Sequence, residues 1–225
     1  MDNIISVASS KQDYDTGFVT RALAEKIAQD NPGKTILTLH KHYGAEHDKV
    51  SYEEIHPFSR VPIYPDKEHP DLYSFYADAY FKMSEMHPDL AIHIVKSLAK
   101  KYDLVICDAG GQIEDAFALG CQFASKETYY VFDHTMDSVK RLAWLKPLLL
   151  KLGIPIGGQI IDHTNGSAEY SYYEYTRTLD LHSMDDTYII NNDRNLDELV
   201  LLAKAICNEQ FEKSRTNDFK DWGDR

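Results

Sequence analysis

Basic residues are scarce in this chain. Its 225 residues include 24 Lys and Arg but 36 Asp and Glu, so the formal net charge at pH 7 is −12. Nucleic acids and anionic membranes attract proteins mainly through basic surfaces. The imbalance argues against a protein that coats nucleic acid. We expect protein partners instead, a second copy of the chain among them.

Cysteine and long apolar runs are also lacking. Cys107, Cys121 and Cys207 show no spacing typical of metal ligands, so we expect reduced thiols. No apolar run approaches the ~18 residues of a transmembrane helix. No basic segment precedes the first apolar run, as it would in a secretory signal. The sequence therefore predicts a cytoplasmic protein without stable membrane insertion.

Glycine is scarce in the first polar loop. An apolar segment at residues 4–8 is followed by the loop Ser9–Gly17 and by apolar residues at helical spacing from Phe18 onwards. Strand, loop and helix in this order form the geometry of a phosphate-binding loop, where backbone N–H groups and the helix N-terminus hold an anion. Such a loop needs several glycines and a lysine. This one has a single glycine, at its end.

Two carboxylates stand in the same loop. Asp13 and Asp15 would lie near the oxygens of a bound phosphate. Each like-charge contact at about 4 Å costs roughly 1 kcal/mol in water and about 4 kcal/mol at an effective dielectric constant near 20. The loop therefore predicts that a triphosphate is repelled unless Mg²⁺ or a rearranged loop intervenes.

Strand-like and helix-like patterns alternate along most of the chain. Strands are expected near residues 4–8, 35–39, 102–111, 128–132, 154–161 and 188–192, and helices from residues 18, 72, 88, 139 and 195. This order predicts an α/β fold with a mostly parallel central sheet flanked by helices. We expect one domain over residues 1–209, with a Pro- and Tyr-rich excursion at 43–88 and a polar tail at 210–225.

Two stretches resemble the MinD/ParA class of P-loop ATPases. The loop Ser9–Gly17 is similar to that family's deviant Walker-A loop, x-K-G-G-x-G-K-T-T, and Tyr102–Gly111 (YDLVICDAGG) is similar to its Walker-B strand. The resemblance extends over about residues 3–205 and implies a P-loop NTPase-like fold. It places Lys11 on the family's signature lysine, which reaches a partner's nucleotide across a dimer interface. It places Asp108 on the aspartate that holds Mg²⁺.

The same comparison shows what the loop has lost. Ser9 and Ser10 precede the signature lysine, Gln12 and Asp13 replace two glycines, Asp15 replaces a third, Thr16 replaces the Walker lysine, and Gly17 replaces the Mg²⁺-binding hydroxyl residue. One diagnostic position is kept and five are lost. No cofactor is therefore expected. ATP with Mg²⁺, held through Lys11 and Asp108, is the alternative.

Several other positions stay open. The family carries an aspartate-containing signature after the second strand, where this chain has His40 and His42. Two histidines without a third ligand favour a structural or exposed role over a metal site. For the aspartate that positions the attacking water in the family, Asp66, Asp71 and Asp78 are all candidates.

Two more features lie in the C-terminal half. Asp162, with Asn165 three residues later, stands where relatives keep an asparagine that contacts adenine. Residues 170–175 hold four tyrosines in six positions. Packing between helices is the favoured role for them, with an aromatic partner surface and a phosphorylation cluster as alternatives.

Three functions remain open. The first is a pseudo-ATPase scaffold or localisation factor, similar to the TadZ/CpaE-like proteins of pilus and secretion assembly. The second is a slow, ATP-dependent dimerising switch that uses Lys11 and Asp108. The third is a small-molecule ligase on the same fold, which would also need an intact phosphate loop.

Overall fold

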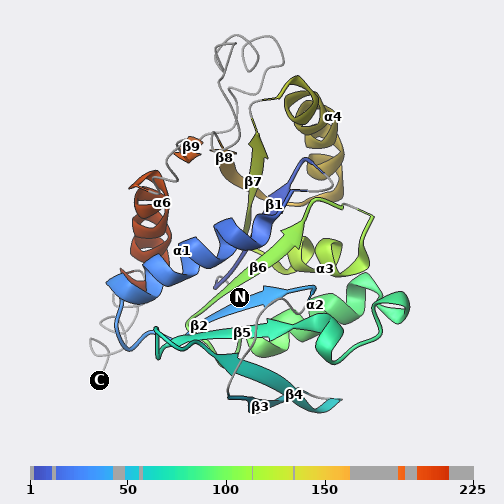
Figure 1. Cartoon of the computed structure of the whole chain (residues 1–225). Helices are drawn as coiled ribbons and strands as arrows, with labels where there is room; N and C mark the ends of the chain where they lie inside the picture. Colours follow the sequence, from blue (N-terminus) through green and yellow to red (C-terminus); the bar gives the residue numbers. More distant parts are fainter. Residues whose placement is uncertain are drawn as a thin grey trace, which may run out of the picture.

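A computed structural model describes residues 3–11, 14–42, 49–55, 58–112, 114–133, 135–162, 187–190 and 197–212. Within these ranges, nine strands form one sheet in the order β3-β4-β5-β2-β6-β1-β7-β8-β9 (Figure 1). The strands are β1 (Ile4–Ser9), β2 (Ile36–His40), β3 (Ser51–Ile55), β4 (Phe58–Pro65), β5 (Leu72–Tyr76), β6 (Leu104–Gly110), β7 (Glu127–Asp133), β8 (Ile156–Asp162) and β9 (Thr187–Ile190). The α-helices are α1 (Thr16–Asp30), α2 (Pro88–Leu98), α3 (Ala116–Ala124), α4 (Met136–Leu152) and α6 (Asp197–Cys207).

The sheet is mostly parallel. β1 lies in the middle and pairs in parallel with β6 and β7, and parallel pairing continues outward to β2 and β5 on one side and to β8 and β9 on the other. Among the strands that the structure describes, only the β3–β4 and β4–β5 pairs are antiparallel. The predicted α/β fold with a mostly parallel sheet is confirmed.

Helices cover both faces of the sheet. α1 and α6 contact each other on one face, while α2, α3 and α4 share an apolar core on the other (Figure 1). Neighbouring residues of β1 point into different cores, since Ile4 belongs to the core under α2, α3 and α4 and Ile5 to the core under α1 and α6. A sheet buried on both faces needs strands that are apolar at nearly every position. This is why the strands appear in the sequence as continuous apolar runs.

Short polar caps set the ends of the helices. Asp15 caps α1, and its carboxylate accepts a hydrogen bond from the backbone N–H of Gly17. Thr135 caps α4 in the same way through the N–H of Ser138. Gly153 ends α4 in the left-handed conformation, with φ 72°, which glycine adopts without strain.

The predicted helix from residue 72 is wrong. Leu72–Tyr76 is strand β5, paired in parallel with β2, and only the short 3₁₀ turns Ala77–Ala79 and Met83–Glu85 follow. Leu72 packs into one core and Phe75 into the other, so no polar face marks the strand period. Aromatic residues favour strands, and here that preference decides the structure.

One helix was missed altogether. α3 follows Asp115, whose carboxylate accepts hydrogen bonds from the N–H groups of Phe117 and Ala118 at 3.0 Å. An aspartate before a run of apolar residues is a helix-start signal that sequence analysis can detect. Gly120 lets α3 approach α2 closely, because a Cβ there would lie 2.3 Å from Cβ of Ala91.

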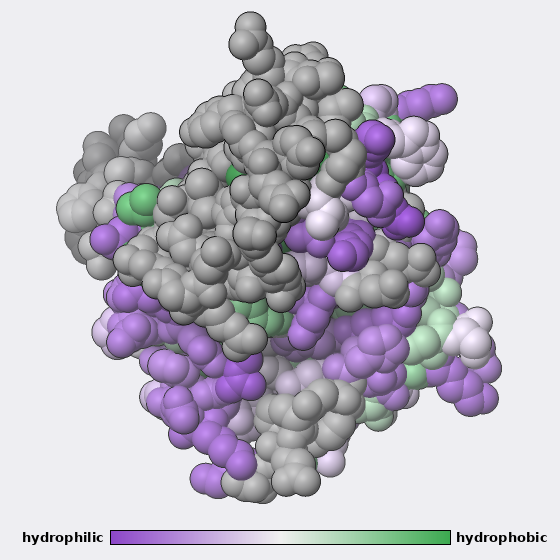
Figure 2. Space-filling view, turned by 45° about the horizontal axis from the view of Figure 1, so that its top comes forward, coloured by the Kyte–Doolittle hydropathy of each residue, from purple (hydrophilic) through white to green (hydrophobic). Residues whose placement is uncertain are grey.

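Some predictions fall outside the described residues. These are Gln12 and Asp13 of the first loop, Asn165, the tyrosine cluster at 170–175, the helix start at Asn195, and most of the predicted tail. Among the described residues, no helix has both the length and the apolar character needed to cross a bilayer. On the face shown in Figure 2, the described residues are mainly hydrophilic and the apolar ones form small scattered groups.

Candidate functional site

A cavity of roughly 500 Å³ lies between the first turn of α1, which follows β1, and the ends of β2, β5 and β6. The helices that follow two of these neighbouring strands, α1 after β1 and α3 after β6, pack on opposite faces of the sheet. In open α/β sheets, ligands bind where adjacent strands send their helices to opposite faces. The volume is also typical of small-molecule sites. The fold therefore places its main candidate site here.

Asp108 forms the centre of this cavity. One carboxylate oxygen accepts hydrogen bonds from the hydroxyl of Thr16 and from the backbone N–H of Gly110, the latter at 3.3 Å. The other oxygen lies 3.1 Å from Nδ1 of His40. A hydroxyl thus stands beside Asp108 although Gly17 lacks one, because Thr16 supplies it one residue earlier.

Strand register brings His40 to this place. His40 ends β2, next to Leu39, which pairs with Cys107 of β6, so it comes level with Asp108. On its other side His40 pairs with Tyr76 of β5, and the two rings stack with centroids 5.4 Å apart. The His40 side chain is 14% exposed. It is a positioned residue and not a loosely exposed one.

The three side chains do not form a nucleophile triad. In such a triad the hydroxyl contacts the imidazole, and the carboxylate orients the imidazole from behind. Here Asp108 stands between Thr16 and His40, and the hydroxyl donates to the carboxylate. This order of contacts does not activate Thr16 for attack.

The N-terminus of α1 is filled by the chain's own carboxylate. Oδ1 of Asp15 lies 3.0 Å from the backbone N of Gly17. Helix N-termini attract anions through their free N–H groups and dipole. A Cβ on Gly17 would lie 3.0 Å from Oδ1 of Asp15 and 3.2 Å from Oδ2 of Asp108. The position therefore leaves little space for a larger residue while both carboxylates keep these places.

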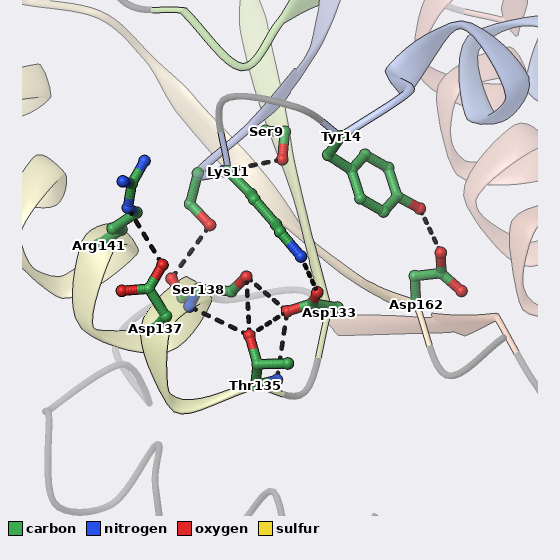
Figure 3. Close-up of polar contacts among 10 residues, drawn as sticks. Ser9, Lys11, Tyr14, Asp133, Thr135, Asp137, Ser138, Arg141 and Asp162 are labelled. Carbon is green, nitrogen blue, oxygen red and sulfur yellow. Dashed lines mark hydrogen bonds and ion pairs between the residues drawn. The ribbon is translucent and has the colours of Figure 1, made fainter. Parts of the chain in front are cut away.

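Lys11 is paired within the chain, as Figure 3 shows. Its Nζ lies 2.9 Å from Oδ2 of Asp133, at the end of β7. The hydroxyls of Thr135 and Ser138 donate to the other oxygen, each at 2.5 Å. Burial raises the pKa of Asp133, but hydrogen bonds from Ser138, Thr135 and Lys11 outweigh it and bring the pKa down to about 2. Asp133 is therefore a stable anion that faces Lys11.

Two more contacts hold the loop between β1 and α1 (Figure 3). The hydroxyl of Tyr14 donates to Oδ2 of Asp162 at 2.5 Å, at the end of β8. The hydroxyl of Ser10 donates to the backbone carbonyl of Ser138 at 3.0 Å. Burial, together with the bond to Asp162, raises the pKa of Tyr14, so its phenol stays protonated. Asp162, considered above as an adenine contact, is engaged by the loop itself.

The remaining candidates go to different places. His42 is exposed and lies 3.0 Å from Asp78, so the two histidines contact different carboxylates. Asp66 lines the cavity, and its Oδ2 lies 3.4 Å from Nη2 of Arg21. Asp71 instead accepts a hydrogen bond from the backbone N–H of Gly33. Among the described residues, no group of three or more His, Cys, Asp and Glu side chains could hold a metal ion.

The described residues do not fit a Mg²⁺–nucleotide complex. Asp108 and Thr16 are the residue types that hold Mg²⁺ in P-loop proteins, but here they bond to each other. Lys11 faces Asp133 instead of an open anion site, and Asp15 occupies the N-terminus of α1. The groups that would contact a nucleotide and its Mg²⁺ are therefore bonded to other side chains or to the backbone of this chain.

Comparison with known proteins identifies the fold. The sequence matches no protein-family profile and no curated protein. Solved structures do match. The MinD cell division protein of Aquifex aeolicus has a TM-score of 0.66 at 14% identity, over 88% of this chain and 86% of that one. This chain has the MinD/ParA fold.

Two further structures with the MinD/ParA fold agree. A ParA-family ATPase from Chlorobium tepidum has a TM-score of 0.63 at 15% identity, over 92% of this chain and 91% of that one. A putative plasmid partition protein from Borrelia burgdorferi, solved with AMPPNP bound, has a TM-score of 0.62 at 15% identity, over 95% and 99%. The likeness covers nearly the whole of each chain.

Sequence analysis did not connect four residues of this site. It treated His40 apart from Asp108, and it gave no role to Tyr14 or Asp133. His40 and Asp108 each end an apolar run, and the carboxyl ends of parallel strands meet at one edge of a sheet. That signal was present in the sequence. The contacts of Lys11 and Tyr14 with carboxylates more than 100 residues away had no local signal.

Proposed function

We propose that this protein is a pseudo-ATPase: a MinD/ParA fold kept as a scaffold or localisation factor, with impaired or absent nucleotide binding. The observation that carries the proposal is the Asp15 carboxylate at the N-terminus of α1. A phosphate bound there would meet a fixed negative charge at hydrogen-bond range, where like-charge contact costs roughly 4 kcal/mol at an effective dielectric constant near 20.

The pairing of Lys11 supports the same proposal. In the family that this chain resembles, the equivalent lysine reaches the partner's nucleotide across a dimer. Here the lysine lies 2.9 Å from Asp133, a carboxylate whose pKa is lowered to about 2. Reaching a partner's phosphate would break this pair and leave the nearly buried Asp133 without its cation, which is costly. If the chain dimerises, we therefore expect contacts other than a Lys11–nucleotide bridge.

The partner we infer is another protein. The net charge of −12 disfavours non-specific contact with nucleic acid. The MinD of Aquifex aeolicus has also been solved as a MinC:MinD complex, so this fold can present a protein-docking surface. A role in pilus or secretion assembly is a narrower form of this proposal.

One contact favours the alternative of a slow nucleotide switch. Thr16 and Asp108 are a hydroxyl and a carboxylate in direct contact at the place where a P-loop protein holds Mg²⁺. If the loop rearranged, this pair would offer two metal ligands, and Lys11 would be released from Asp133. Affinity for MgATP that depends on Asp108 is what this alternative requires.

Calorimetric titration of the purified full chain with MgATP and with MgADP tests the proposal. We expect no binding heat up to roughly 1 mM ligand and no change in oligomeric mass with ATP. A matched positive control replaces the five departing loop residues with those of the resembled pattern: Gln12→Gly, Asp13→Gly, Asp15→Gly, Thr16→Lys and Gly17→Thr. Binding by this variant but not by the parent would locate the defect in the loop. A parent Kd tighter than ~100 μM would refute the proposal.

A further inference from the structure

The cavity beside Asp108 has polar groups that the contacts described so far do not use. The His40 ring lines it, and Asp108 contacts this ring at Nδ1. In the tautomer that carries its proton on Nδ1 and donates it to a carboxylate, Nε2 is a hydrogen-bond acceptor. Among the described residues, Asp108 is the hydrogen-bond partner of His40, at Nδ1. Nε2 is left for a ligand that brings an N–H or O–H group.

The charges of the cavity select among such ligands. Its lining includes four carboxylates, from Asp15, Asp66, Asp108 and Asp115, but only two permanent cations, Arg21 and Lys41. Both cations are already paired, because Lys41 lies 2.5 Å from Asp115 and Arg21 contacts Glu25 and Asp66. The balance of charge favours a cation and disfavours an anion.

An aromatic wall completes the cavity. Phe18, in the first turn of α1, lines it and is 38% exposed, although it is a large apolar residue. Phe117 lines the cavity from α3 and is buried. Aromatic rings attract cations over their faces and also pack against apolar ligand bodies. A ligand with a ring and an ammonium group would match both parts of the cavity.

We propose that this cavity is a binding site for a small organic cation, a primary amine carried on an apolar or aromatic body. The ammonium group donates to Nε2 of His40 and lies near the carboxylate of Asp15, and the body packs against Phe18. This site goes beyond the scaffold proposed above and needs no nucleotide.

Three probes of nearly equal size and different charge test the site. They are tyramine, tyrosol and 4-hydroxyphenylacetate, which carry an ammonium, a hydroxyl and a carboxylate on the same phenol ring. Each is titrated into the full chain and followed by ligand-observed NMR and calorimetry. We expect tyramine to bind with a Kd below ~1 mM, tyrosol at least about threefold more weakly, and the carboxylate not at all.

Two substitutions connect the binding to the named residues. Asp15→Asn keeps a good helix cap but removes one charge, and we expect tyramine affinity to fall about threefold or more. His40→Phe keeps a ring against Tyr76 but removes the acceptor, and we expect a fall of about tenfold. The matched controls are Asp71→Asn, a carboxylate that holds a backbone N–H away from the cavity, and His87→Phe, an exposed histidine that does not line the cavity. Neither should change affinity more than about twofold.

Several outcomes would overturn the site. These are no tyramine binding at ~10 mM, equal binding of all three probes, or an unchanged tyramine affinity in both Asp15→Asn and His40→Phe. Thermal melting of each variant shows whether it folds, and Asp15→Asn keeps the test valid if His40→Phe does not. The nucleotide titration is a separate measurement, so failure of the amine site and failure of the pseudo-ATPase proposal can be told apart.

Discussion

Replacing Asp133 with Asn should reduce the pH dependence of this protein's stability between pH 7 and pH 3. Asp133 is 6% exposed and accepts hydrogen bonds from Lys11, Thr135 and Ser138. Burial raises its pKa, but these bonds lower it from 3.8 to about 2. A carboxyl whose pKa is lower in the folded state binds protons more weakly there than in the unfolded chain. It therefore stabilises the fold while it is ionised.

The sign and size of the effect follow from that shift. The contribution is fully present above the unfolded pKa, near 4, and is lost as pH falls through the folded pKa, near 2. A shift of this size corresponds to about 2 kcal/mol at pH 7. At pH 3 the unfolded chain is already mostly protonated at this site, and the contribution falls to about 1 kcal/mol.

Urea unfolding of the parent and of Asp133→Asn at pH 7, 5 and 3 measures the contribution of ionised Asp133 to the free energy of unfolding. We expect the free energy of unfolding to differ by about 2 kcal/mol at pH 7 and pH 5, and by about half of that at pH 3. The control is Asp137→Asn, four residues along the same chain segment. Asp137 is 74% exposed and pairs only across a helix turn with Arg141 at 3.3 Å, so its loss should cost less than about 0.5 kcal/mol at every pH.

Two results would refute this reasoning. If the difference between the parent and Asp133→Asn is the same at pH 7 and pH 3, the stabilisation does not come from ionised Asp133. If the difference is no larger than that of Asp137→Asn, the pairing of Lys11 contributes little to the fold. In that case the argument that Lys11 is held within its own chain loses its energetic basis.

Three further changes test other parts of the structure. Thr16→Lys alone should not produce MgATP binding in calorimetry, since Asp15 still holds the N-terminus of α1; a Kd tighter than ~100 μM would contradict this. Tyr14→Phe should lower the free energy of unfolding by about 1–3 kcal/mol in urea titrations, because a part-buried hydrogen bond to the Asp162 carboxylate is lost. An unchanged urea midpoint would count against that contact. Gly120→Ala should lower the free energy of unfolding by about 1–3 kcal/mol or more, because its Cβ would lie 2.3 Å from Cβ of Ala91. A thermal midpoint equal to that of the parent would show that α2 and α3 can move apart without cost.

Much of the fold was predictable because its signals are local. β1, β6 and β7 are continuous apolar runs, and a parallel sheet covered on both faces requires such runs. Gly153 marked the end of α4, since only a residue that tolerates positive φ ends a helix in this way. The prediction of β5 as a helix was wrong for the complementary reason. Leu72 and Phe75 pack into opposite cores, and the single polar residue, Ser74, does not separate a strand from a helix turn.

The candidate site was less predictable because its contacts are distant in sequence. The resemblance placed Lys11 and Asp108 correctly at the ends of β1 and β6. It gave no hint that Lys11 would meet Asp133, 122 residues later, because only the order of the strands brings these residues together. His40 joins Asp108 through the register of β2 with β6, and register across a sheet depends on tertiary structure.

Under the pseudo-ATPase proposal, the departures of the loop from the resembled pattern exchange contacts with a nucleotide for contacts within the chain. When nucleotide and Mg²⁺ are absent, a P-loop has three kinds of polar group without a partner. These are the free N–H groups at the helix N-terminus, the lysine and the aspartate. In this chain Asp15 accepts a hydrogen bond at the N-terminus of α1, and Asp133 pairs with Lys11. Thr16 and His40 contact Asp108. Each of these is an internal contact that nucleotide would have to displace. We therefore infer that single reversions toward the ATPase sequence lower stability without restoring affinity, because each breaks one contact while the other two remain.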